Sequence, residues 1–226
     1  MRGRHTHIMT DEWPPDVGKA LDAIMERVRT EFAAKNTARE AALPLCREAI
    51  RYSANAIRAV HRDDFAVAAE LVGKAGDAVA TAKERLAGHE DILYAGFVHD
   101  AQKEFTEASI TLALIAGHQL PTPEQLGVQL TAFLNGMGEA VGELRRHLLD
   151  TLRGGDVDRC EVWLRAMDEM YSVLVTVDYP DAMTGGLRRT TDSVRGILEK
   201  TRGDLTLSVQ QRRLEERLDA FGERLK

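Results

Sequence analysis

Two stretches decide the fold of this chain: KEFTEASITLALI at residues 103–115 and FLNGMGEAVGELRR at residues 133–146. Each has the apolar spacing of an amphipathic helix. Glu104 and Glu107 are separated by i,i+3 spacing, and Glu139 and Glu143 by i,i+4 spacing, so each pair shares one helix face. Carboxylates embedded among apolar side chains are costly to bury unless their charge is compensated. A divalent cation held between the two helices would compensate it and would also supply catalytic chemistry.

The rest of the chain continues the helical pattern almost throughout. Periodicity and capping residues predict helices at about 16–35, 38–60, 65–87, 91–115, 124–152, 156–177 and 187–218. Pro44 is expected to kink its helix or to mark the first turn. No segment alternates as a strand does. We therefore predict an all-α protein, with a flexible extension at 1–15 and a single domain of about seven helices at 16–226.

Composition and charge limit the class of protein. Of the 226 residues, 44% are hydrophobic and 29% are charged, which is typical of a globular chain rather than a disordered one. No apolar run approaches the roughly 18–20 residues of a membrane span, so we expect no membrane partner. The net charge of −6 argues against nucleic-acid binding by bulk electrostatics. Cys46 and Cys160 lie in helical patterns without a C-x-x-C motif, which favours buried thiols and a reducing cytoplasm.

The spacing of the glutamates distinguishes two kinds of metal site. Di-iron bundles use Glu-x-x-His, but here Glu104 is followed at that spacing by Glu107, and Glu143 by Arg146. An all-oxygen site suits Mg²⁺ or Mn²⁺, the hard ions that activate water and stabilise phosphoryl oxygens. An alternative stays open at this point, in which the glutamates face solvent and pair with Lys103, Arg145 or Arg146.

Several further stretches point to one protein family. They are SANAIRAVHRDDF (53–65), KEFTEA (103–108), FLNGMGEAVGELRR (133–146), GDVDRCEVWLRAMDEMY (155–171), DYPDAMTGGLRRTTDSVR (178–195) and LEKTRGDLT (198–206). In this order they resemble the translin/Trax family, in particular its archaeal members, over roughly residues 16–210. The resemblance implies a seven-helix all-α fold, a translin-like helical bundle, for the domain at 16–226. It also implies assembly of identical chains into a closed, octamer-like shell that encloses RNA or single-stranded nucleic acid.

The same resemblance implies a role for the four glutamates. Trax-type chains are Mg²⁺-dependent endoribonucleases with an E-x-x-E pattern on one helix and D-x-x-x-E on the next, whereas translin-type chains mainly bind nucleic acid. The first pattern falls on Glu104 and Glu107, and the second on Glu139 and Glu143, with Glu139 in place of Asp. We expect these four to be the metal ligands and catalytic residues, with Mg²⁺ or Mn²⁺ as the cofactor. The extra methylene at Glu139 is expected to shift a bound ion by about an ångström.

Basic residues near the glutamates are the expected RNA contacts. Lys103, Arg145 and Arg146 flank the carboxylates and are expected to hold phosphates, with weak surface salt bridges as the alternative. The other basic residues fit solvated faces or contacts between helices better; they are His61, Arg62, Arg188, Arg189, Lys200 and Arg202. The stretch at 92–98 is apolar where translin-type chains are basic, which argues against tight translin-style binding of single strands.

Three functions remain open from the sequence. The first is a Trax-like, metal-dependent endoribonuclease that acts within a homo-oligomer. The second is a non-catalytic oligomer that binds RNA or single-stranded DNA and uses its acids only structurally. The third is a helical scaffold for a protein partner. Convergent carboxylates would favour the enzyme, whereas splayed or arginine-paired acids would favour the binding protein.

Overall fold

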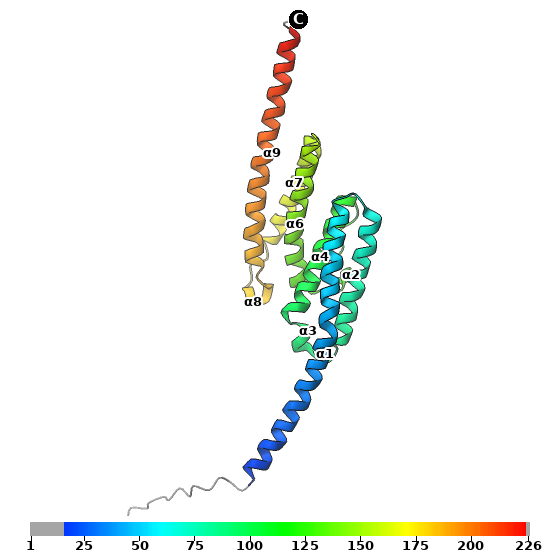
Figure 1. Ribbon diagram of the computed structural model, residues 1–226. Helices are drawn as coiled ribbons and strands as arrows, with labels where there is room; N and C mark the ends of the chain where they lie inside the picture. The colour runs from blue at the N-terminus through cyan, green and yellow to red at the C-terminus, as the bar shows by residue number, and fades with distance from the viewer. Residues whose placement is uncertain (1–15, 225–226) are drawn as a thin grey trace, which may run out of the picture.

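The computed structural model describes residues 16–224, and these residues form only helices and their connections (Figure 1). The long helices are α1 (Val17–Val60), α2 (Phe65–Arg85), α4 (Gly96–Ala116), α6 (Leu130–Arg153), α7 (Val157–Leu174) and α9 (Leu187–Arg224). Single turns in the connections are α3 (Glu90–Leu93), α5 (Pro123–Leu126) and α8 (Asp181–Thr184). The predicted all-α class is confirmed. The extension predicted at residues 1–15 lies outside the described residues.

The largest difference from the predicted helices is in α1. A break was expected between residues 35 and 38, yet α1 is one helix of 44 residues with Pro44 inside it. Thr37 does not cap a new helix, because its hydroxyl donates to the carbonyl of Ala33 at 2.9 Å, one turn back in the same helix. Ala42 and Cys46, on either side of Pro44, are buried in the core. Tertiary packing therefore keeps α1 helical through a residue that weakens an isolated helix.

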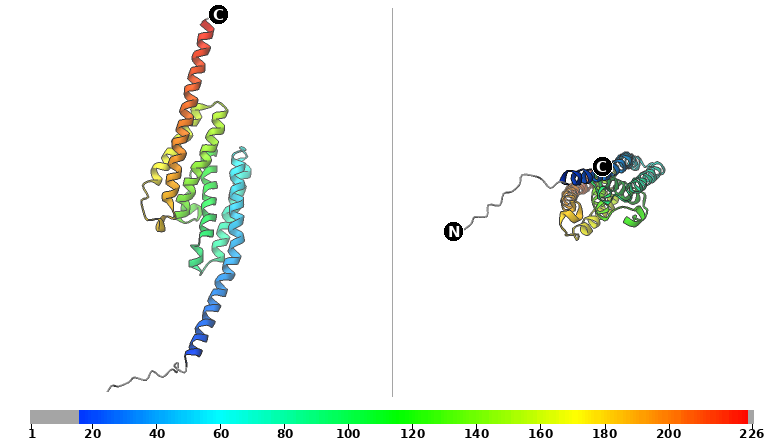
Figure 2. Two further views of the ribbon diagram at one scale, coloured as in Figure 1. Left: turned by 60° about the vertical axis from the view of Figure 1, so that its left-hand side comes forward. Right: turned by 90° about the horizontal axis from the view of Figure 1, so that it is seen from below.

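Helices α4 and α6 lie at the centre of the bundle. Helix α4 contacts α1, α2 and α6, while α6 contacts α4, α7 and α9 (Figures 1 and 2). The core between α1, α2 and α4 is rich in alanine, and the core around α6, α7 and α9 contains larger side chains such as Leu144, Met167 and Leu198. Cys46 and Cys160 lie in these cores as free thiols, as predicted. The α4–α6 pair thus joins the two sides of the molecule.

Two long helices extend past the bundle in opposite directions. The first half of α1 and the second half of α9 project beyond the other helices in both side views (Figures 1 and 2). Their apolar side chains are exposed, namely Leu21, Ile24, Met25, Val28 and Phe32 in α1 and Leu207, Leu214, Leu218 and Phe221 in α9. The projecting helices therefore carry apolar stripes that this chain leaves uncovered.

Within residues 16–224, no helix has an apolar stretch long enough to cross a membrane.

A glycine sets how closely α4 and α6 approach each other. A Cβ atom added at Gly136 would lie 2.5 Å from the carbonyl oxygen of Lys103 and 2.8 Å from the Cβ of Thr106. The backbones therefore touch at this point, and only glycine leaves room for the contact. Since residues 103–107 carry the first glutamate pair, Gly136 fixes the position of that pair relative to α6.

Replacement of this glycine tests the importance of the crossing. We expect Gly136→Ala to destabilise the fold by about 1–3 kcal/mol, because the added methyl group overpacks a backbone contact. Gly142→Ala on the same helix is the matched control. It meets no atom within 4 Å, and it should stabilise the protein by up to about 1 kcal/mol. Urea unfolding measures both variants, and equal effects would contradict the tight crossing.

Candidate metal centre

The α4–α6 crossing brings three of the four predicted glutamates together. One carboxylate oxygen from each of Glu104, Glu107 and Glu139 lies within 4.8 Å of the other two. Opposite ligands of an octahedral Mg²⁺ lie about 4.2 Å apart, since each bond is about 2.1 Å long. Small side-chain rotations would therefore close the three oxygens around one ion. The donor set is made only of carboxylates, which fits Mg²⁺ or Mn²⁺.

Glu143 lies beside this cluster and is held by a histidine. Its Oε2 atom is 2.5 Å from Nε2 of His61, and the His61 side chain is only 4% exposed. His61 is the C-cap residue of α1, so the end of α1 fixes a carboxylate on α6. The second oxygen of Glu143 makes no hydrogen bond to the described residues and is available to an ion or a water molecule. Histidine partners of this kind orient ligands around metal sites.

His61 is a site residue that the sequence did not reveal. The sequence favoured a solvated or inter-helix position for it, and it is 82 residues away from Glu143 along the chain. Its place in the stretch SANAIRAVHRDDF, which the family resemblance includes, was the only available signal.

Lys103 provides a positive charge inside the cluster. Its Nζ atom donates to Oε1 of Glu139 at 2.7 Å and lies 3.7 Å from Oε1 of Glu104. Burial of Lys103 lowers its pKa, but the hydrogen bond and charge of Glu139 and the charge of Glu104 outweigh burial and raise the pKa overall. The predicted RNA contact at Lys103 is thus an internal partner of two carboxylates in this structure.

The two arginines after Glu143 have different surroundings. Arg145 donates to Thr201 and to Asp204, both at 2.7 Å, and its side chain is 15% exposed. Arg145 therefore ties α6 to α9. Arg146 is exposed, and it forms no ion pair with residues 16–224. Of the two, Arg146 is the one whose guanidinium group is available to a nucleic acid.

Burial and mutual repulsion raise the pKa values of the clustered carboxyl groups. Burial raises the pKa of Glu107 to about 8, with further contributions from the charges of Glu104, Glu139 and Glu143. Burial also raises the pKa of Glu104, and the charge of Glu139 adds to this effect while Lys103 opposes it. Without a metal ion, Glu107 is therefore mostly protonated at pH 7. Binding of a cation would release that proton.

A pocket of about 420 Å³ opens beside two of these glutamates. Its walls come from three helices and consist of Glu107, Gly138, Glu139, Arg189, Thr190, Ser193 and Ile197. A Cβ atom at Gly138 would lie 2.3 Å from Cγ2 of Thr190, so α9 lies directly on α6 at this point. Thr190 also donates to Oδ1 of Asn135 at 2.6 Å. The start of α9 is thus the second element, beside the α4–α6 pair, that shapes the site.

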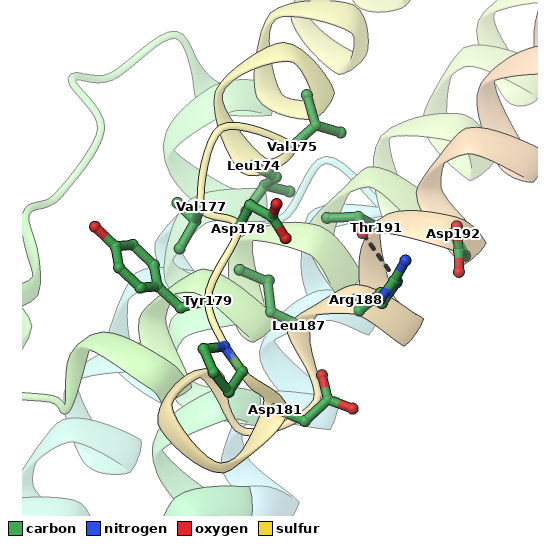
Figure 3. Close-up of a pocket in the computed structure, with 11 residues that line it drawn as sticks. Leu174, Val175, Val177, Asp178, Tyr179, Asp181, Leu187, Arg188, Thr191 and Asp192 are labelled. Atoms are coloured by element: carbon green, nitrogen blue, oxygen red, sulfur yellow. Dashed lines mark hydrogen bonds between the residues drawn. The ribbon is translucent and has the colours of Figure 1, made fainter.

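A larger pocket of about 590 Å³ lies between the end of α7 and the start of α9 (Figure 3). Asp178, Tyr179, Asp181, Arg188 and Asp192 are among its lining residues. Its acidic side chains do not converge. Throughout the described residues, Glu104, Glu107 and Glu139 are the one group of His, Cys, Asp or Glu side chains with ligand atoms close enough to share an ion. The smaller pocket beside the glutamates is therefore the candidate site.

Known proteins that are similar to this chain include one sequence relative and three solved structures. No protein-family model matches the chain. An uncharacterized protein of Methanocaldococcus jannaschii is 29% identical over 188 residues, which is 83% of each chain. The crystal structure of AfC3PO has a TM-score of 0.75 and 30% identity, over 83% of this chain and 98% of that one. The AfC3PO–duplex RNA complex has a TM-score of 0.72 and 29% identity, over 83% and 97% of the two chains. Apo-NeC3PO, with a TM-score of 0.70 and 20% identity over 87% and 99%, supports the fold alone.

The raised pKa of Glu107 predicts how stability depends on pH without metal. The pKa is about 8 in the folded chain and about 4.3 in an unfolded one. The folded state therefore binds more protons between these values, so its stability should fall as pH rises from about 4 to 8. Urea unfolding in EDTA at several pH values measures this decline.

Glu107→Gln should flatten the decline, because glutamine cannot release a proton. Glu161→Gln, an exposed glutamate on α7, is the control and should leave the pH profile unchanged. A Glu107→Gln profile that superimposes on the wild type would contradict the raised pKa.

Proposed function

This chain belongs to the translin/Trax family, and from that membership we propose that it is a metal-dependent endoribonuclease acting within a homo-oligomer. The observation that supports the proposal best is the convergence of Glu104, Glu107 and Glu139 beside a pocket. RNA is the proposed substrate because the similar AfC3PO chain is in complex with duplex RNA. The buried free thiols agree with a reducing compartment, and a cytoplasmic location is part of the proposal.

The residues of the site have different proposed roles. Glu104, Glu107 and Glu139 would hold the ion, and Glu143 would complete the set from the next turn of α6, on the same face as Glu139. Mg²⁺ or Mn²⁺ bound there would activate water and stabilise negative charge on a phosphodiester. Glu143 has one oxygen fixed by His61, so its other oxygen can serve as a ligand or accept a proton from water.

Lys103 has a second use once a cation is bound. Its ammonium group and a divalent ion would compete for the carboxylate of Glu139. An ion at Glu139 would therefore free the ammonium group to contact a phosphate oxygen. Glu139 stands where the Trax pattern has Asp, and its longer side chain is the one that reaches Lys103.

The runner-up function is a non-catalytic, RNA-binding oligomer. The Lys103–Glu139 and His61–Glu143 contacts favour this reading, since they show two of the four acids already paired within the chain. In that case the carboxylates would stabilise the helix crossing only. Cleavage assays decide between the two functions.

Removal of two ligands tests the enzyme proposal. We expect Glu104→Gln/Glu107→Gln to reduce Mg²⁺-dependent cleavage of RNA by at least about 10²-fold, because both a ligand pair and its charge are lost. The fold should persist, since glutamine keeps the shape of both side chains. Circular dichroism and cleavage of labelled oligoribonucleotides measure these effects, with Glu161→Gln as the control. Full activity in the double variant would exclude the proposed site.

The homo-oligomer is supported by the exposed apolar stripe of α1. Leu21, Ile24, Met25, Val28 and Phe32 share one face and are all exposed in the single chain. Apolar stripes of this length on a projecting helix mark surfaces that another chain covers. A second copy of the same chain is the proposed occupant, as in the shells that the family resemblance implies.

A charge placed in this stripe tests the assembly. We expect Ile24→Asp/Phe32→Asp to shift the protein to smaller species in analytical ultracentrifugation, because a buried carboxylate without a partner opposes association. Val162→Asp, at an exposed valine on α7, is the matched control and should retain the native mass. An unchanged mass in the double variant would show that this stripe is not an interface.

A further inference from the structure

Arg189 is the basic residue that the structure brings to the carboxylates and that the proposed catalysis has not yet used. It lines the same 420 Å³ pocket as Glu107 and Glu139 but comes from α9 instead of α4 or α6. The residue is exposed, and within residues 16–224 its guanidinium group makes no ion pair or hydrogen bond. Arg189 is therefore a basic residue without a charge partner in the described part of the chain, on the same pocket as two acidic residues.

The hydroxyl groups that line the pocket beside Arg189 differ in their hydrogen bonds. The Thr190 hydroxyl donates to Asn135. Together with the contact between Thr190 and Gly138, this bond fixes the first turn of α9 on α6. The Ser193 hydroxyl makes no hydrogen bond in the described part of the chain, so it is free to donate. The pocket is thus lined, on the side of α9, by one arginine and one serine whose side chains have no partner in the described residues.

Charge balance favours such a group. The four glutamates carry up to four negative charges, of which Lys103 and one divalent ion would offset three. An RNA phosphodiester adds another negative charge at the same place. A guanidinium group on the same pocket would offset that added charge, and its planar fork matches two phosphate oxygens.

We propose that Arg189, with the hydroxyl of Ser193, forms the subsite that binds the scissile phosphodiester beside the carboxylates. This inference rests on the proposed function, because it assigns the substrate phosphate to the pocket next to the metal ligands. Arg189 acts as a catalytic residue in the sense that it touches the reacting phosphate. Its role is to position and neutralise that group, while the carboxylates hold the ion.

The adjacent arginine supplies a matched control. Arg188 lines the other pocket, together with Asp178 and Asp192 (Figure 3). Arg188→Ala and Arg189→Ala remove the same charge from the same turn of α9, yet only the second lies beside the glutamates. Any difference between the two variants therefore reports the pocket and not net charge or helix stability.

The test measures RNA cleavage and Mn²⁺ binding by the full chain. We expect Arg189→Ala to lower kcat/KM for a labelled oligoribonucleotide by about 10²-fold, with Mn²⁺ affinity in calorimetry unchanged. Arg189→Lys should recover part of the loss, and Arg188→Ala should stay within about threefold of the wild type. Equal losses in the two alanine variants would overturn the proposal, as would a loss of Mn²⁺ affinity that is specific to Arg189→Ala.

A second readout separates this inference from the enzyme proposal. If the wild type cleaves no RNA, fluorescence anisotropy with the same oligoribonucleotide in Mn²⁺ replaces the kinetic assay. About tenfold weaker binding by Arg189→Ala than by Arg188→Ala, with a smaller salt dependence, would support the phosphate subsite although the enzyme proposal fails. Equal binding by the two variants would overturn the subsite.

Discussion

The close crossing of α4 and α6 at Gly136 is the constraint on which the rest of the structure depends. Because no Cβ separates Gly136 from the backbone of Lys103, the two helices approach closely enough for Glu104 and Glu107 to meet Glu139. Helix α4 also packs on α1 and α2, and α6 on α7 and α9. The close approach at Gly136 therefore helps to position the carboxylates, and the α4–α6 pair connects both sides of the bundle.

Gathering carboxylates in a half-buried place is unfavourable, and the chain offsets the cost in three ways. Glu107 retains a proton, as its pKa of about 8 indicates. Glu139 accepts a hydrogen bond from Lys103, and Glu143 is held by His61. The first two compensations can yield to a cation, because a proton can leave and an ammonium group can turn away. The same features that stabilise the metal-free chain thus suit it to bind an ion.

Helix α9 forms one wall of the pocket beside the glutamates, and α4 and α6 form the other. Its first turn rests on Gly138, and farther along the helix Thr201 and Asp204 accept hydrogen bonds from Arg145. These contacts hold the segment that carries Arg189 at a fixed place beside the glutamates. Arg145, an expected RNA contact, hydrogen-bonds within the chain and so helps to hold the helix that carries Arg189.

The sequence by itself determined what depends on local helix geometry. Apolar periodicity was enough for the all-α class, and the i,i+3 and i,i+4 spacings were enough to place each glutamate pair on one face. Local signals were wrong near residue 36, where α1 continues without a break and Thr37 donates back to Ala33 in the same helix. Only the tertiary structure decided that Lys103 pairs with Glu139, 36 residues away, and that Arg189 lines the same pocket as Glu107 and Glu139. Contacts between distant helices have no local signature, since they depend on how closely the backbones can approach.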